Sequence, residues 1–205
     1  MFETYSKFTN SLVDMVNSSR GLNRRTRNAL VPTEVRKAFK DGAKLAVELG
    51  LVLDTVSEMS ARLSGGKMLA TIEDAMFTRM GDEQTGFFSL TTDSGLEEQK
   101  SPPRHFNWHQ ALYADEEVQA VLYCHSPALL RAANSHSLPD IAVLVDAAEL
   151  LQAVDFADPE AEAIATASKE ASMLLIPQHG LLTWGADVYE TIVKAEILAR
   201  VFESM

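Results

Sequence analysis

The spacing of apolar residues predicts helices near both ends of the 205-residue chain. Residues 2–18 carry apolar side chains at steps of three and four, which is the period of an amphipathic helix. The same spacing recurs over residues 33–48, where Thr33 can cap the first turn and Gly50 can end the helix. A third amphipathic helix is expected over residues 186–205.

Short apolar runs between these helices predict the strands of a sheet. Residues 118–124 and 173–177 are each apolar enough to form a buried strand. The Ser-Gly-Gly-Lys stretch at 64–67 predicts a tight turn, and residues 68–80 are apolar enough for one or two short strands. Another short strand is expected over residues 87–90. Because strands and helices alternate, the sequence predicts one α/β domain with a central sheet covered by helices.

Three more helices are expected in the second half of the chain. A pair of prolines at 102–103 marks a break before a helix over residues 104–114. Another helix is expected over residues 126–136, directly after a buried strand. Asp158 is expected to cap the start of a further helix, with Pro159 in its first turn.

Composition and charge exclude several classes of protein. An apolar fraction of 46% with 23% charged residues is typical of a globular domain. The net charge of −11 argues against a nucleic-acid or anionic-membrane surface, because both need a cationic footprint. Cys124 is the only cysteine, so a reducing compartment is the default. With no long apolar run and no signal-peptide profile, a cytoplasmic protein is expected.

Four of the five histidines lie in two segments of the sequence. His105 and His109 fall in a predicted helix, His125 follows a buried strand, and His179 follows another. Imidazole is the commonest metal ligand in proteins, and strand ends can bring several imidazoles together. These positions predict a divalent-metal site built from His105, His125 and His179. The alternative for His125 and His179 is a hydrogen-bonded core histidine, and the alternative for His105 is a helix-start histidine that faces solvent. His109 is expected to be structural.

Five motifs together resemble one known family. They are SEMSARL at 57–63, MFTRMG at 76–81, WHQALY at 108–113, AVLYCHSPALLRAA at 120–133 and IPQHGLLTWG at 176–185. On these motifs the chain resembles the class II aldolase and adducin family. The resemblance implies a single three-layer α/β/α domain with a central, mainly antiparallel sheet over residues 31–205. Residues 1–30 would then be an N-terminal helical extension. The resemblance also implies a homotetramer.

The resemblance assigns chemical roles to individual positions. His125 and His179 stand where the family has two ligand histidines. Tyr123 replaces the third ligand histidine, and His105 replaces the family's glutamate. Three histidines still suffice for a tetrahedral ion, for which we expect zinc, with manganese or cobalt as alternatives. Tyr123 and Glu58 are the catalytic candidates. For Tyr123 a buried core side chain is the first expectation, a weak metal contact the second and an acid catalyst the third.

Four further residues are expected to bind the substrate. Ser57 and Glu58 replace the Gly-Asn pair of the family, and Thr78 and Gly81 keep its Thr-x-x-Gly turn. Arg104 can hold a carboxylate or a phosphate through paired N–H donors.

Two functions follow from this resemblance. The first is a metal-dependent lyase of the aldolase type, in which the ion stabilises an enediolate formed from a small hydroxy-carbonyl substrate, such as a sugar or a sugar acid. The second is a catalytically impaired homologue that serves as a binding or scaffold protein. The altered site residues are compatible with either.

Overall fold

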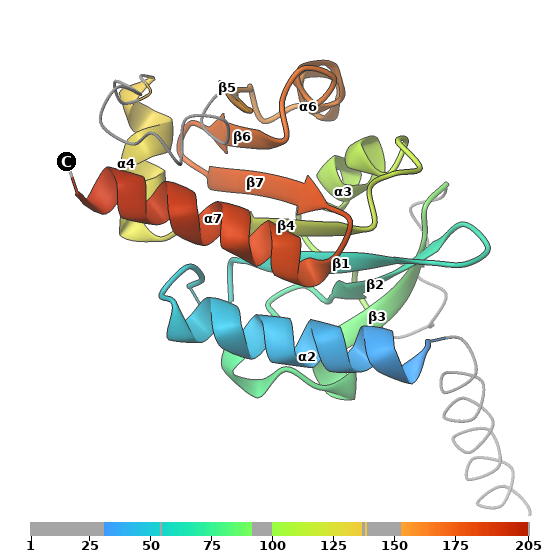
Figure 1. The fold of residues 1–205 in the computed structure, drawn as a ribbon. Coiled ribbons are helices and arrows are strands. Elements are labelled where there is room, and N and C mark those ends of the chain that lie inside the picture. Colours follow the sequence, from blue (N-terminus) through green and yellow to red (C-terminus); the bar gives the residue numbers. More distant parts are fainter. Residues whose placement is uncertain (1–30, 54, 92–99, 137, 139–152, 205) are drawn as a thin grey trace, which may run out of the picture. The chain divides into compact units, whose positions relative to one another are not determined.

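A computed structural model gives the fold of the chain (Figure 1). It describes residues 31–53, 55–91, 100–136, 138 and 153–204. The chain divides into two compact units, residues 1–36 and residues 37–205. Of the first unit the structure describes residues 31–36. The helix predicted over residues 2–18 and the extension predicted over residues 1–30 lie outside the described part, so this division of the chain stays a prediction.

The second unit contains a seven-stranded sheet with the order β3-β2-β1-β4-β7-β6-β5. In chain order its strands are β1 Glu58–Leu63, β2 Lys67–Thr71, β3 Thr85–Ser89, β4 Ala120–Cys124, β5 Val154–Phe156, β6 Met173–Ile176 and β7 Gly180–Gly185. Every neighbouring pair is antiparallel except β5 and β6, which run parallel. The central, mainly antiparallel sheet is therefore confirmed.

Helices cover both faces of this sheet (Figure 1). The described helices are α2 Thr33–Glu48, α3 Phe106–Leu112, α4 Pro127–Ser135, α6 Ala161–Ala167 and α7 Val188–Glu203, with short 3-10 helices η1 Phe77–Arg79 and η2 Asp82–Gln84. On one face α3 and α6 contact each other, and on the other α4 and α7 pack against β4, β6 and β7. The predicted α/β architecture is confirmed. In the part of the chain that is described, every helix is too short or too polar to cross a membrane.

Side chains along β4 alternate between the two faces of the sheet. Val121 and Tyr123 join a buried cluster that includes Trp108 of α3, whereas Cys124 lies on the opposite face and is fully buried. β1 pairs with β4 so that Glu58 lies directly opposite Tyr123. Residues that face each other in an antiparallel pair point to the same side. Glu58 therefore lies on the face of the sheet that α3 covers.

Glycines set two of the predicted element boundaries. α2 spans Thr33–Glu48 as predicted, and Gly50 follows it with a left-handed φ of 68°. The predicted turn between β1 and β2 contains Gly65 and Gly66, with φ values of 74° and 67°. Residues with a Cβ seldom adopt such φ values, so glycine favours both the end of α2 and the turn between β1 and β2.

The start of α6 differs from the prediction. Asp158 is not its N-cap, because Glu160 precedes the first helical residue, Ala161, in an extended conformation. The carbonyl oxygen of Pro159 accepts a hydrogen bond of 2.9 Å from the indole N–H of Trp108. The predicted cap at Asp158 is therefore wrong, and Pro159 lies before the helix rather than in its first turn.

Candidate active site

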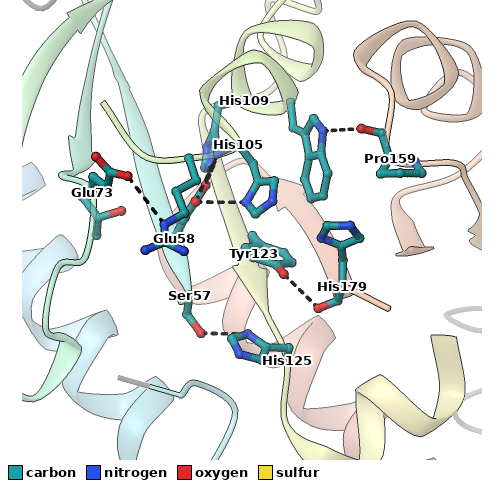
Figure 2. A network of polar contacts seen from close by, with 12 residues as sticks. Ser57, Glu58, Glu73, His105, His109, Tyr123, His125, Pro159 and His179 are labelled. Atoms are coloured by element: carbon teal, nitrogen blue, oxygen red, sulfur yellow. Dashed lines mark hydrogen bonds and ion pairs between the residues drawn. The ribbon is translucent and has the colours of Figure 1, made fainter. Parts of the chain in front are cut away.

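Glu58, the first residue of β1, has a buried carboxylate beside the start of α3 (Figure 2). Its Oε1 lies 3.0 Å from Nδ1 of His105, and its Oε2 lies 3.3 Å from Nε2 of His109. The backbone N–H of His105 also donates to both carboxylate oxygens at 3.2 Å. His105 is the N-cap residue of α3, so its N–H has no partner within the helix. The carboxylate therefore accepts hydrogen bonds both from the N-terminal end of α3 and from two imidazoles.

The surroundings of Glu58 lower its pKa from the ordinary 4.5 to about 2. Desolvation by burial raises this pKa, but the hydrogen bonds from His105 and His109 and the attraction of their charges outweigh it. The carboxylate is therefore ionised throughout the neutral range.

The charge of Glu58 fixes the direction of a chain of hydrogen bonds. An ionised carboxylate only accepts, so Nδ1 of His105 and Nε2 of His109 each carry a proton. When His109 is neutral, its Nδ1 accepts from the Ser60 hydroxyl, whose oxygen lies 2.7 Å away. Ser60 Oγ lies 2.9 Å from the hydroxyl of Tyr113, which then donates to it. We call these five residues the polar chain.

The ring of His105 is surrounded by other aromatic rings. It stacks on Trp108 with a centroid distance of 4.0 Å and meets Tyr123 edge-on at 4.8 Å. The ring of His179 lies at 5.3 Å, perpendicular to it. Figure 2 shows the His105 ring between the Glu58 carboxylate and the ring of His179. The other ring nitrogen of His105, Nε2, therefore lies among these aromatic rings.

His125 directly follows β4 and lies on the side of Tyr123 away from His105 (Figure 2). Its ring stacks on Tyr123 with a centroid distance of 5.8 Å, and its Nδ1 lies 3.5 Å from the hydroxyl of Ser57. The hydroxyl of Tyr123 donates to the backbone carbonyl of His179 at 2.9 Å. Tyr123 therefore contacts all three histidines predicted to bind a metal.

A strained turn presents His179 at the start of β7. Gln178 has φ 66°, and its backbone N–H donates to the side-chain oxygen of Asn134 at 2.7 Å. Gly180 has φ 118°, and a Cβ on it would lie 2.6 Å from the carbonyl oxygen of Cys124. A side chain at this position would clash with backbone, so the close approach of the two strand ends requires glycine.

Burial changes the protonation of the remaining site residues. It lowers the pKa of His125 and of His179, and repulsion from His105 lowers both further. Burial also raises the pKa of Tyr123, and the nearby charge of Glu58 adds to this effect. At neutral pH, the two imidazoles and the phenol are therefore uncharged.

The predicted metal ligands do not form an ion site as they are placed. Among the residues that the structure describes, no group of three or more His, Cys, Asp or Glu side chains is arranged so that it could hold a metal ion. His105 directs one nitrogen to Glu58, and Tyr123 is a neutral phenol, which is a poor ligand. The ligand set of His105, His125 and His179 therefore stays a prediction.

The other predicted substrate-binding residues are Arg104, Thr78 and Gly81. Arg104 is half-exposed, with its guanidinium 3.7 Å from Glu73 and also paired with Asp74. Arg104 therefore has two acidic partners rather than Glu58. Thr78 lies in η1, and Gly81 immediately precedes η2. The substrate-binding roles of these residues stay predictions.

Sequence reasoning gave no role to Ser60 or Tyr113 of the polar chain. It predicted His109 to be structural, and the structure shows its ring fully buried and hydrogen-bonded to Glu58 and Ser60. Two signals could have found them: the alternation that puts Glu58 and Ser60 on one face of β1, and the four-residue spacing of the histidines, which puts them on one face of α3. The contact between strand and helix is not readable from either segment alone.

A match over most of the chain shows the class of the protein. Residues 39–205 match the family model described as Class II Aldolase and Adducin N-terminal domain. The chain belongs to this family.

Three solved structures illustrate the similarity. YgbL from Klebsiella pneumoniae is 16% identical, with a TM-score of 0.72, covering 84% of this chain and 88% of that one. An L-fuculose 1-phosphate aldolase is 15% identical, with a TM-score of 0.71, covering 86% and 88%. A sugar-phosphate aldolase from Thermotoga maritima is 17% identical, with a TM-score of 0.70, covering 83% and 93%. At these identities the likeness concerns the fold. A comparison with curated proteins found no match.

Proposed function

We propose that the chain is a lyase of the aldolase type that acts on a small hydroxy-carbonyl compound, such as a sugar or a sugar acid. Family membership supports this class of chemistry. The observation that carries the proposal is the buried, ionised Glu58 within hydrogen-bond distance of two imidazoles. Burying a charge is costly, and clusters of strongly shifted pKa values are typical of functional sites.

Aldol cleavage needs a base and a return of the proton. The base removes the proton from the hydroxyl on the carbon β to the carbonyl, and the O–H electron pair forms a new aldehyde. The bond between the α and β carbons breaks, and its electrons pass into an enediolate. A proton delivered to the α carbon completes the second product. Decarboxylation, dehydration and epimerisation pass through similar oxyanions, so substrates for all four reactions belong in the screen.

Class II aldolases generally use a divalent metal ion. Zinc, or alternatively manganese or cobalt, stays the prediction for this chain. Metal analysis of protein purified without a chelator, together with His125→Ala and His179→Ala, tests it. Stoichiometric metal in the wild type and less in both variants supports the prediction, whereas a wild type that takes up no metal contradicts it.

A second candidate function is a binding or scaffold protein that has lost catalysis. The observation that favours it is Tyr123, a neutral side chain that lies where a metal-binding centre was predicted. A screen of hydroxy-aldehydes and hydroxy-acids, with added zinc, manganese or cobalt, separates the two functions. Turnover of any compound supports the lyase, and binding without turnover supports the scaffold.

Assembly and location complete the proposal. Family members are often oligomeric, and we propose a homotetramer in the cytoplasm. Sedimentation of the purified protein and fractionation of cells test these two points.

A further inference from the structure

The guanidinium of Arg104 is already paired with two carboxylates. Its Nε lies 3.7 Å from a carboxylate oxygen of Glu73, and its Nη2 is paired with Asp74. Nε and Nη2 form the edge with which a guanidinium binds a carboxylate or a phosphate through two parallel N–H groups. An anionic group of a substrate would therefore have to displace Glu73 and Asp74 from this edge.

The backbone places these two acidic residues beside Arg104. The N–H of Glu73 donates to the carbonyl of Ser101 at 3.2 Å, which joins their turn to the segment that carries Arg104. Asp74 has a left-handed φ of 57°, a conformation that Asp and Asn adopt more readily than most residues. Because exposed ion pairs are weak by themselves, this backbone arrangement is what keeps both carboxylates near the guanidinium. We call Glu73 and Asp74 the acidic turn.

The acidic turn borders the candidate active site. Arg104 immediately precedes His105, whose backbone N–H donates to the buried carboxylate of Glu58. Figure 2 shows the side chains of Glu58 and Glu73 on the side of the His105 ring away from His179. A substrate group that extends from the histidines towards Arg104 therefore meets acidic side chains.

The charge balance at this border is negative. Glu73 and Asp74 against Arg104 leave one net negative charge, and Glu58 adds a third carboxylate. A charged imidazole beside Glu58 would cancel only the charge of Glu58, so the balance is negative in either protonation state of the histidines. A phosphate ester carries between one and two negative charges at neutral pH, and like charges that face each other oppose binding.

We propose that Glu73 and Asp74 set the specificity of the site by occupying Arg104, so that the substrate is an uncharged hydroxy-carbonyl compound rather than a phosphate ester or a sugar acid. This inference rests on the proposed function and narrows its substrate class. Arg104 then forms part of the border of the site and becomes an anion-binding residue only when the acidic turn is neutralised.

Inorganic phosphate is the first probe, because its binding is measured without any substrate. Isothermal titration calorimetry compares the wild-type full chain with the double variant Glu73→Gln/Asp74→Asn, in which asparagine tolerates the left-handed φ. We expect the double variant to bind phosphate at least about 10-fold more tightly, because the guanidinium edge is then free of carboxylates. Adding Arg104→Gln to the double variant should remove this gain.

A matched control removes the same two charges elsewhere. Glu116 and Glu117 are exposed and follow the other end of α3, so Glu116→Gln/Glu117→Gln should bind phosphate as the wild type does. Equal phosphate affinity in the wild type and in Glu73→Gln/Asp74→Asn overturns the inference. A gain that the control shares, or that persists after Arg104→Gln, also overturns it.

Turnover separates this inference from the proposed function. Each uncharged compound that the wild type converts is assayed beside its phosphate ester and its sugar acid. We expect kcat/KM of the wild type to be at least about 10-fold higher for the uncharged compound, and this ratio to fall in Glu73→Gln/Asp74→Asn. A wild type that converts only phosphorylated or carboxylated compounds overturns the inference and leaves the proposed function standing. A wild type without any turnover overturns the proposed function, and phosphate binding then decides by itself whether the acidic turn excludes anions.

Discussion

Replacing Glu58 by glutamine should remove a contribution to folding that depends on pH. The carboxylate has a pKa of about 2 in the folded chain against 4.5 when unperturbed, which corresponds to about 3 kcal/mol of stability at neutral pH. Because the folded-state pKa is the lower one, this stability is present in full above pH 4.5. It is lost as the pH falls from 4.5 towards 2, where the carboxylate takes up a proton in both states.

Urea unfolding followed by tryptophan fluorescence measures this contribution. The free energy of unfolding is determined at several pH values between 6 and 2.5 for the wild type, for Glu58→Gln and for the control Glu116→Gln. The difference between the wild type and Glu58→Gln should shrink by about 2–3 kcal/mol over this range. The control should track the wild type. A difference that stays constant, or grows as the pH falls, would refute the assignment of Glu58 as a buried, ionised carboxylate.

Three further substitutions test the packing around the site, each by denaturant unfolding. Gly180→Ala should cost about 2–3 kcal/mol, because a Cβ would lie 2.6 Å from the Cys124 carbonyl oxygen at a left-handed φ; wild-type stability would contradict this. Trp108→Phe should cost about 1–3 kcal/mol by leaving the Pro159 carbonyl without its indole donor, and an unchanged midpoint would argue against that bond. Ser60→Ala should cost about 1–3 kcal/mol, since two buried partners lose their hydrogen bond, and a neutral result would exclude the polar chain as a stabilising feature.

Local signals in the sequence were sufficient for much of the fold. The apolar spacing of residues 33–48 and the left-handed glycines at 65 and 66 each encode one element or turn without reference to the rest of the chain. The strand β7 was not predicted, because a buried apolar run that opens with Gly180 carries no alternation of its own. Asp158 was wrongly predicted as the cap of α6, because the helix begins only at Ala161, after Glu160.

The site was less accessible to sequence reasoning than the fold. The histidines at 105, 125 and 179 were predicted to meet around one metal ion, and the structure brings the rings of His105 and His179 within 5.3 Å, while the ligand set stays a prediction. Their chemistry depends on pairings across long stretches of chain, such as Glu58 with His105, 47 positions apart. A residue's partner across such a separation is set by sheet register and helix placement, which neither segment encodes alone.

The hydrogen bond between Trp108 and Pro159 has a mechanical consequence. The indole that supports the His105 ring is tethered at its nitrogen to the segment leading into α6, so His105 and α6 are coupled through one side chain. A displacement of α6 would move the indole of Trp108 through this hydrogen bond, and the stacked ring of His105 would change its orientation with it. Substitutions far from the histidines can in this way alter the ring orientation of His105 without contacting it.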